Sequence, residues 1–319
     1  MNKDIDVLTF GDICVDLILS SKDMVPEFGQ KEKLVENYLL EMGGSCCIFA
    51  CQTAKLGLKT VVIGKAGKDY FGTLVCNTLK DAGVLIDYIK VEDDEKTGIS
   101  VALNRGNDRA ILTFNGTIDA LGIQDVSYSL LKRIKHLHIG SYFLMKKLQP
   151  YYVGIVKKVK EYGGTISLDT NWDPEENWKS GLQDIIPYID ILLLNENEIM
   201  AITGCKSVEE AIKSIKKYIP TIVIKVGENG SVAYSGDNVY KIEAIPGEVV
   251  DTVGAGDSFD GGFVYGYLNH KSIEECLRIG NVCGSLNTRE AGGVKGQPRN
   301  IDVQKYVSDL NIDETKIAL

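Results

Sequence analysis

The sequence lacks a long apolar run, an apolar leader and an excess of positive charge. Its most apolar stretches, such as IDILLL at residues 189–194, are far shorter than a membrane-spanning helix, which needs about 20 apolar residues. Residues 1–12 contain no apolar segment of the kind that a secretory signal has. These absences disfavour a membrane protein and predict that the chain stays in the cytoplasm.

Acidic residues outnumber lysines and arginines, 44 to 35, and the formal net charge is -9. Proteins that bind the phosphate backbone of nucleic acids are usually basic, so this balance disfavours a nucleic-acid partner. It does not exclude a phosphate ligand, because backbone amides and a metal ion can hold one locally.

The eight cysteines follow no zinc-ligand spacing. In a reducing compartment they are most simply explained as small buried apolar residues. His136 and His138 lie two residues apart, but the sequence offers no identifiable third metal ligand. We therefore expect both histidines to have a structural role.

Short β-rich runs alternate with helical patterns along the 319 residues, which predicts an α/β fold with a mostly parallel sheet covered by helices. The predicted strands are residues 5–11, 60–67, 136–140, 165–169, 189–195 and 221–227. The predicted helices between them are residues 45–56, 69–81, 150–162 and 206–217. Further strands are expected within 230–242, helices over most of 255–290, and a short helix after residue 300.

Four segments interrupt this alternation, in two pairs: residues 13–19 with 33–40, and residues 98–104 with 109–114. The second pair flanks the polar turn RGND, which indicates a hairpin. We expect the four segments to form a small second sheet that acts as a lid. The prediction is then one domain over residues 1–319, with a lid built from about residues 12–40 and 96–116.

The segment DTVGAGDSFDGGFVYGY, residues 251–267, is the most informative one. Gly254, Ala255 and Gly256 lead into an apolar helical stretch, and small residues let an anion approach the N–H groups at a helix N-terminus. Neither a dinucleotide fingerprint nor a Gly-x-x-x-x-Gly-Lys-Ser/Thr phosphate loop occurs in the chain, and a lone Gly-x-Gly is weak evidence. Any nucleotide site must therefore be built differently.

Asp257 follows these small residues in the first turn of the predicted helix. An acidic residue there is common and mildly stabilising, which is one explanation of its presence. A carboxylate beside an anion pocket also repels the phosphate, unless its task is to touch the attacking hydroxyl. This combination indicates phosphoryl transfer, with the amides stabilising charge and Asp257 as the base. With an unperturbed pKa of about 3.9, the carboxylate would be ionised at neutral pH.

Residues 251–260 resemble the C-terminal signature of the ribokinase family, also called the phosphofructokinase-B family. GGSCCIFACQTAKLG, residues 43–57, resembles its N-terminal Gly-Gly helix motif, and the likeness extends from residue 11 to residue 298. The resemblance implies a ribokinase-like three-layer αβα sandwich with a mostly parallel central sheet and a small β-sheet lid. It also implies an ATP-dependent kinase that uses Mg²⁺ and phosphorylates an alcohol group of a small sugar or sugar-like substrate.

The resemblance assigns roles on the side of the acceptor. Asp257 resembles the catalytic base, and Gly254, Ala255 and Gly256 resemble the anion hole. The candidate substrate ligands are Asp16, with Asp12 as a weaker one, and the turn glycines Gly43 and Gly44. Ile48 departs from the family pattern, in which an Asn contacts the substrate. Because a buried polar contact contributes about 1 kcal/mol, we expect the substrate to be held differently here.

The resemblance also assigns roles on the side of the nucleotide. Glu198 would organise water around Mg²⁺ and Asn195 would lie near the phosphates, although Asn and Glu at this spacing also make a capping box. Lys225 would reach a phosphate. The remaining candidates are Gly227 and Gly230 at the ATP-side turn, Asn281 and Gly284 beside adenine, and Asp169 and Asn171 near the active site. Asp251 resembles a ligand of K⁺, but Arg299 replaces the later Ser of the family and weakens that inference.

Two other functions remain open on the sequence. A nucleoside kinase would need an apolar slot for the base, to which Ile48, Phe49 or Tyr142 would contribute. A non-catalytic sugar-binding regulator should have lost its base or anion hole, and here both are present. The expected partners are a small sugar or nucleoside, with no nucleic acid and no membrane, and a second copy of the chain is expected to pair through the lid.

Overall fold

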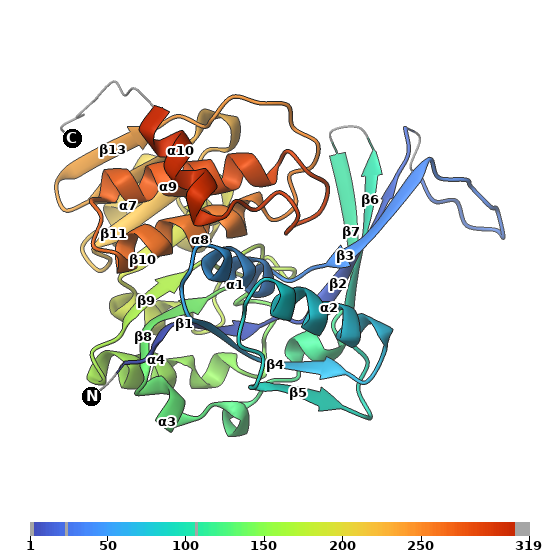
Figure 1. The fold of residues 1–319 in the computed structure, drawn as a ribbon, viewed down its shortest axis with the longest axis horizontal. Helices are drawn as coiled ribbons and strands as arrows, with labels where there is room; N and C mark the ends of the chain where they lie inside the picture. The colour runs from blue at the N-terminus through green and yellow to red at the C-terminus, as the bar shows by residue number, and fades with distance from the viewer. Residues whose placement is uncertain (1–2, 23–24, 106–107, 310–319) are drawn as a thin grey trace.

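The computed structural model describes residues 3–22, 25–105 and 108–309. A nine-stranded sheet runs through it in the order β13-β12-β11-β10-β9-β8-β1-β4-β5. Its strands are β1 (Ile5–Gly11), β4 (Thr60–Gly67), β5 (Ile89–Glu92), β8 (Ile134–Ile139), β9 (Thr165–Leu168), β10 (Ile191–Asn195), β11 (Thr221–Lys225), β12 (Ser231–Ser235) and β13 (Asn238–Ile242). From β5 to β11 neighbouring strands pair in parallel, and β12 and β13 add two antiparallel pairs at one end (Figure 1).

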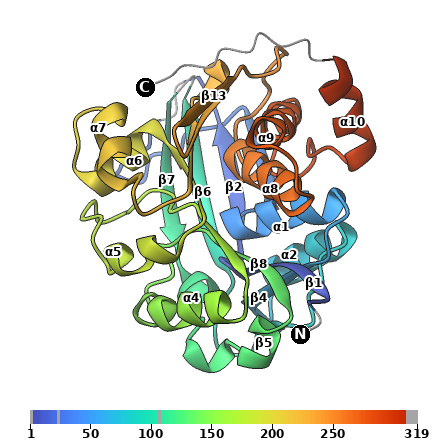
Figure 2. The ribbon, with the colours of Figure 1, turned by 90° about the vertical axis from the view of Figure 1, so that its left-hand side faces the viewer.

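Helices cover both faces of this large sheet (Figure 2). One layer contains α1 (Ser45–Lys55), α2 (Tyr70–Asp81), α8 (Ala255–Leu268), α9 (Ile273–Asn287) and α10 (Asn300–Asp309). The other contains α3 (Tyr128–Leu131), α4 (Tyr152–Glu161), α5 (Leu182–Ile185), α6 (Glu196–Thr203) and α7 (Val208–Ile215). The predicted three-layer αβα arrangement is confirmed.

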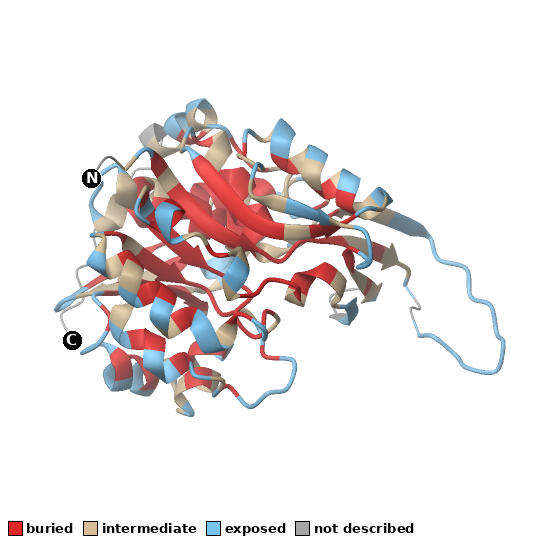
Figure 3. Cartoon of the chain, turned by 90° about the horizontal axis from the view of Figure 1, so that it is seen from below, coloured by how far each residue is buried: buried red, intermediate tan, exposed pale blue. Residues whose placement is uncertain are grey.

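Each face of the large sheet has its own apolar core, and the buried residues follow the strands (Figure 3). Leu8 and Leu137 pack toward the layer of α4. Val7 and Val223 pack on the opposite face, with Phe259 of α8. Because alternate residues of a strand point to opposite faces, a strand covered on both sides is apolar throughout, which is why these strands were readable as continuous apolar runs.

The second sheet has four strands in the order β3-β2-β6-β7: β2 (Cys14–Ser20), β3 (Asn37–Met42), β6 (Gly98–Arg105) and β7 (Asp108–Phe114). We call it the small sheet; it projects from one end of the molecule (Figure 1). It was predicted, although β3 begins later than expected because residues 33–36 belong to the exposed β2–β3 connection. Residues 106 and 107 of the predicted RGND turn lie outside the described residues.

The two faces of the small sheet differ in chemistry. Strand pairing places Asp16, Ser100 and Thr113 in one row across it, and Leu17, Val101 and Leu112 in the adjacent row. Adjacent rows point to opposite faces. We call the face of Asp16 the inner face and the face of Leu112 the outer face.

Two further expectations have structural outcomes. His136 and His138 both hydrogen-bond the hydroxyl of Ser167, at 2.7 and 2.8 Å, so they tie β8 to β9 inside the core. Burial lowers the pKa of each to about 3, which keeps both rings neutral. Across the described ranges, no helix has the length and apolarity needed to cross a bilayer.

Candidate active site

The parallel strands of the large sheet end at one edge, and polar residues follow them there. The residues at or just after these ends are Asp12 after β1, Ser141 after β8, Asp169 after β9, Asn195 at the end of β10 and Lys225 at the end of β11. In open α/β sheets, ligands bind outside the carboxyl ends of the strands. The candidate site is therefore built on this edge.

The N-terminus of α8 meets this edge with an open first turn. Its N-cap is Gly254, which supplies no side-chain cap and has a φ of 72°. A Cβ at Gly254 would lie 2.7 Å from the Cα of Gly293, so both the conformation and the space require glycine. A helix leaves its first N–H groups without intrahelical acceptors. The N–H of Ala255 bonds the Thr252 carbonyl at 3.3 Å, which leaves Gly256 and Asp257 as the better amide donors of the predicted anion hole.

Asp257 lies in the first turn of α8 and is only 9% exposed. Burial raises the pKa of its carboxyl to about 7, with the negative charge of Asp169 adding to the effect. The carboxyl therefore differs from the fully ionised group that an unperturbed pKa predicts. A general base works best with a pKa near the working pH, so this shift suits the predicted role.

Lys225 contacts two carboxylates at the same edge. Its Nζ lies 2.7 Å from Asp169 Oδ2 and 3.2 Å from both oxygens of Asp260. Although burial pulls the pKa of Lys225 down, the charges of Asp169 and Asp260 raise it above its usual value. A Cβ on Gly256 would lie 3.4 Å from the same Nζ, so the amine also borders the anion hole.

This pairing was not foreseen from the sequence. A contact between Lys225 and a phosphate remains a prediction, whereas its ion pairs with two acids are present in the structure. Asp260 was overlooked, although it lies three residues after Asp257 in the same signature. The available signal was that an acid one helical turn further on shares a face of α8 with Asp257.

Asp12 holds the start of α1. Its Oδ1 accepts the N–H of Cys46 at 3.0 Å, and its Oδ2 accepts the hydroxyl of Ser141. Because the N-cap of α1 is Gly44, which has no side chain to cap the helix, the carboxylate of Asp12 takes that place. Burial raises the pKa of Asp12 to about 6. Contact with a substrate remains a prediction for Asp12.

Asp16 lies beside Gly43, and Asp12 lies beside Gly44. Asp16 lies on β2, and its carboxylate occupies the space that a Cβ on Gly43 would need. Gly44 has a φ of 84°, and a Cβ there would meet the backbone oxygen of Asp12. The two glycines thus let the chain pass between both carboxylates, and the role of the group in substrate binding stays a prediction.

Ile48 stands at the position where the family pattern has an Asn. Its side chain is 2% exposed and lies 3.0 Å from the position of a Cβ on Gly254 and 2.5 Å from that of a Cβ on Gly293. The residue therefore packs against the backbone that forms the start of α8.

Asn195 and Glu198 form a capping box at the start of α6. The Asn195 side chain accepts the Glu198 N–H, and the Glu198 carboxylate accepts the Asn195 N–H, both at 2.9 Å. The capping alternative is thus confirmed. Burial, followed by the charge of Asp169, raises the pKa of Glu198 to about 7, so a cation there would be favourable. Its Mg²⁺ role remains a prediction.

Among the other nucleotide-side candidates, Gly227 and Gly230 follow β11, and Asn281 of α9 lies against the end of β13. Gly227 and Gly230 have φ values of 57° and 85° around a short 3-10 turn. Asn281 donates to the carbonyls of Ile242 and Glu243, at 3.0 and 3.2 Å. These contacts hold the surrounding chain in place, and contact with a nucleotide stays a prediction.

Gly284 and Asp251 also have structural contacts. A Cβ on Gly284 would lie 3.0 Å from the Ala255 carbonyl, so glycine allows α9 to approach α8. Asp251 accepts the N–H groups of Val253 and Gly292, each at 3.0 Å. The carboxylate therefore orders the loop that precedes α8, and K⁺ ligation remains a prediction.

The large α/β sheet, the small second sheet and the buried acid at the N-terminus of α8 agree with the ribokinase-like class that the sequence resembles. The sequence profile of the pfkB family carbohydrate kinases matches residues 4–300. The chain therefore belongs to the pfkB family of carbohydrate kinases.

Individual relatives agree with this assignment. An uncharacterised sugar kinase of Archaeoglobus fulgidus is 29% identical over 250 residues, which cover 78% of this chain and 99% of that protein. The ribokinase of Lactococcus lactis is 26% identical and covers 96% of this chain and 98% of its own. A crystal structure of a putative ribokinase II from E. coli, in complex with ATP and Mg²⁺, superimposes with a TM-score of 0.83 at 26% identity, covering 96% of this chain and 100% of that one.

Proposed function

We propose that the protein transfers the terminal phosphoryl group of ATP to a hydroxyl of a small sugar. The observation that carries the proposal is Asp257, a buried carboxyl with a raised pKa at the uncapped N-terminus of α8. The acceptor hydroxyl would donate its proton to this carboxylate as it attacks. The amides of Gly256 and Asp257 would stabilise the charge that develops on the phosphoryl oxygens.

A divalent cation fits the charge of this region. Asp169, Asp257, Asp260 and Glu198 are all buried, and Lys225 is the cation that faces them. Surplus buried carboxylate is stabilised by a bound cation. Glu198 would hold Mg²⁺ through water, and the bound ion would offset charge on the transferred group. K⁺ beside Asp251 is a weaker proposal, because both oxygens of that carboxylate already accept N–H groups.

The inner face of the small sheet favours a sugar over a nucleoside. It presents Asp16 with the hydroxyls of Ser100 and Thr113, which lie 3.0 Å apart, and such groups suit a polyhydroxylated ligand. The three residues considered for a base slot are buried: Ile48 packs on Gly254, Phe49 stacks on His138, and Tyr142 stacks on Tyr152. These contacts leave them unavailable to a nucleobase.

ADP release over a panel of sugars, polyols, matched sugar phosphates and nucleosides tests this proposal, with ATP and Mg²⁺ present. We expect a higher kcat/KM with a sugar than with any nucleoside. A preference for nucleosides would establish the alternative activity. No ADP with any acceptor, together with saturable sugar binding in a thermal-shift assay, would instead identify a non-catalytic sugar-binding regulator.

We further propose that residues 1–319 are one domain in which the small sheet, from about residues 12–40 and 96–116, closes over the acceptor as a lid. Exclusion of water by closure limits hydrolysis of ATP.

All eight cysteines are free, which supports a reducing, cytoplasmic location for the protein.

The outer face of the small sheet supports pairing with a second copy of the chain. Tyr38, Leu112 and Phe114 are 68%, 65% and 53% exposed on it, and an apolar hollow beside Tyr70 and Phe71 continues it. Contiguous exposed apolar surface is typical of interfaces.

Leu112→Glu should shift the protein to monomer in analytical ultracentrifugation. Ile301→Glu, at a 67% exposed residue of α10, is the matched control. A monomeric unmodified protein would refute the pairing.

A further inference from the structure

Two consecutive glycines, Gly43 and Gly44, connect β3 to α1 beside Asp16. We call them the acceptor turn, because they are predicted to lie against the sugar. Gly44 is the N-cap of α1 and has a φ of 84°. Neither glycine has a side chain, so the turn has no side-chain contacts of its own to fix its conformation. Its position must therefore be set by residues that hold it from outside.

Two residues hold the start of α1 immediately after this turn. Asp12, which follows β1, accepts the N–H of Cys46 at 3.0 Å. Asn171, which follows β9, donates from its amide nitrogen to Ser45 Oγ at 3.0 Å. The first two residues of α1 are therefore bonded to two different strand ends of the large sheet.

Ser141, which follows β8, connects these two residues to each other. Its hydroxyl donates to Asp12 Oδ2, and its backbone N–H donates to Asn171 Oδ1 at 2.9 Å. A backbone N–H can only donate, which fixes the orientation of the Asn171 amide and leaves its nitrogen for Ser45. Asp12 and Ser141 are each 2% exposed, so water competes little for these hydrogen bonds.

The backbone of Asn171 contacts the nucleotide side of the site. Its φ of 55° is a left-handed conformation that Asn tolerates better than most residues. Its N–H donates to Asp169 Oδ1 at 3.2 Å, and Asp169 Oδ2 accepts from Lys225 at 2.7 Å. Asn171 thus contacts the start of α1 through its side chain and the acid that pairs with Lys225 through its backbone.

We propose that Asn171 is a positioning residue that sets where the acceptor turn lies relative to Asp169 and Lys225. Its backbone is bonded to Asp169, and its side chain fixes Ser45, the residue that follows the turn. A sugar bound at the turn is thereby held in line with the phosphoryl group, as phosphoryl transfer requires. The inference rests on the proposed function, because it takes the acceptor turn as part of the sugar site.

The experiment compares Asn171→Gly with the unmodified enzyme in steady-state kinetics, using the best acceptor, ATP and Mg²⁺. Glycine adopts a φ of 55° without strain and keeps the backbone N–H to Asp169, so this variant removes only the two side-chain hydrogen bonds. We expect the KM for the sugar to rise about 10-fold, the effect of losing two ordinary hydrogen bonds. The KM for ATP should stay within about twofold, because the contacts of Lys225 are unchanged.

Ser45→Ala tests the same hydrogen bond from its other end. It removes the acceptor of the Asn171 amide nitrogen but keeps the bond between Asn171 and Ser141, so the KM for the sugar should rise less, about threefold. Because both changes remove one shared bond, the double variant should be no worse than Asn171→Gly alone. Ser45→Thr keeps a hydroxyl and should restore the KM of the unmodified enzyme.

His270→Gly is the matched control. His270 has a similar φ of 58°, is exposed and lies beyond the C-terminal end of α8, whose N-terminus meets the site. The change relieves the same backbone conformation without touching the site, so kcat and both KM values should be unchanged. Melting temperatures of all variants report on the fold. If Asn171→Gly fails to fold, Ser45→Ala and Ser45→Thr decide the question.

The outcomes distinguish this inference from the proposed function. If the unmodified protein phosphorylates no sugar, the proposed function fails and the inference fails with it. If a sugar is phosphorylated while Asn171→Gly keeps the original KM for it, the function stands and the positioning role is refuted. An equal rise in the KM for ATP would also refute the role, because Asn171 would then support the whole edge of the sheet and not the acceptor turn.

Discussion

The carboxyl edge of the large sheet and the small sheet differ in how their side chains are held. At the edge, Asp257 is 9% exposed, and Lys225 forms ion pairs with the carboxylates of Asp169 and Asp260. On the small sheet, Tyr38 and Leu112 are 68% and 65% exposed. Phosphoryl transfer needs one fixed geometry, which buried and paired side chains at the edge of the large sheet can hold. The exposed outer face of the small sheet is instead free to meet another surface.

The largest effect is expected at the proposed base. Asp257→Asn should lower kcat about 10²- to 10⁴-fold, because an amide cannot take the proton of the acceptor. An ADP-release assay measures the loss. Near-normal turnover would contradict the idea that chemistry is concentrated at the edge of the large sheet.

The same variant should not lose stability. Ionising Asp257 in the fold is unfavourable, since burial raises its pKa to about 7, above its value in the unfolded chain. That cost is absent below about pH 4, where the group is protonated in both states, and fully present above about pH 7. We therefore expect Asp257→Asn to melt at an equal or higher temperature at pH 8, which scanning calorimetry checks.

Removal of the buried cation comes next. Lys225→Met should lower the free energy of unfolding by about 3–5 kcal/mol, because Asp169 and Asp260 are left buried without a counter-charge. Urea denaturation measures it, and the loss should shrink toward pH 5 as the acids bind protons. Lys241→Met, at an exposed position of β13, is the control and should have little effect. Equal stabilities for the two variants would mean that the edge is less tightly held than its contacts indicate.

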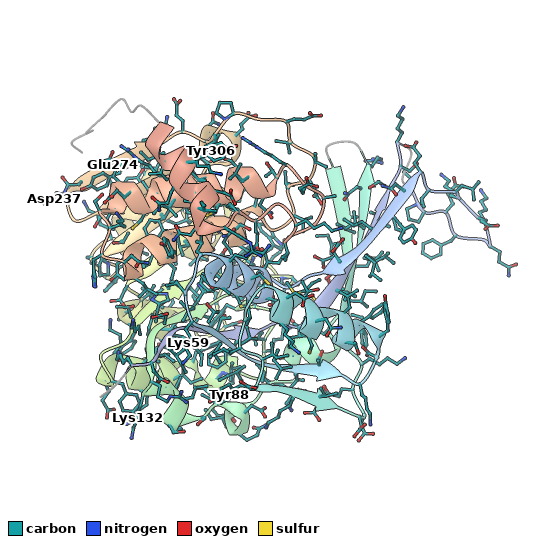
Figure 4. All side chains as sticks on the ribbon, viewed as in Figure 1. Lys59, Tyr88, Lys132, Asp237, Glu274 and Tyr306 are labelled. Carbon is teal, nitrogen blue, oxygen red and sulfur yellow. The ribbon has the colours of Figure 1, made fainter. Side chains whose placement is uncertain are left out.

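A smaller effect is expected for Gly254→Ala. Its φ of 72° disfavours any other residue, and the new Cβ would press on Gly293, so we expect a loss of about 1–3 kcal/mol together with reduced turnover. Gly236→Ala has a similar φ of 59° with nothing within 4 Å, so it should cost less and leave turnover unchanged. Its turn lies beside Asp237, at the end of the molecule opposite the small sheet (Figure 4). Denaturation and ADP release should be measured for both variants. Gly236→Ala reports the effect of backbone strain alone, and Gly254→Ala adds the contact with Gly293.

The smallest effect is expected on the outer face of the small sheet. Leu112→Ser should change the free energy of unfolding of the monomer by less than about 0.5 kcal/mol, since the side chain is already 65% exposed. Dilute samples, in which association is absent, provide the measurement. A loss above 2 kcal/mol would show that this sheet is held as firmly as the large one.

Much of the fold was predictable because each strand of the large sheet is locally apolar. β1 and β4 match the predicted residues 5–11 and 60–67. The strand β5, IKVE, was missed since it is an edge strand of 4 residues with a half-polar pattern. The start of β3 was misplaced because exposed residues 33–36 include Leu34 and Val35, whose apolar character suggested a strand.

The candidate site was only partly predictable. The small residues before Asp257 and the acid itself were evident from their order along the chain. The partners of Lys225 were not, because Asp169 lies 56 residues away from it in the sequence. The hydrogen bonds of the Asn171 side chain with Ser141 and Ser45 likewise join three separate parts of the sequence.

The sequence by itself determined the layers, the small sheet and the residues that start α8, because hydrophobic periodicity and small residues before a helix are local properties. Tertiary structure alone decided how those residues are charged and oriented. Burial raises the pKa of Asp257, and neighbouring strand ends bring Lys225 to two acids. Such effects depend on desolvation and on distances across the sheet, which no local pattern encodes.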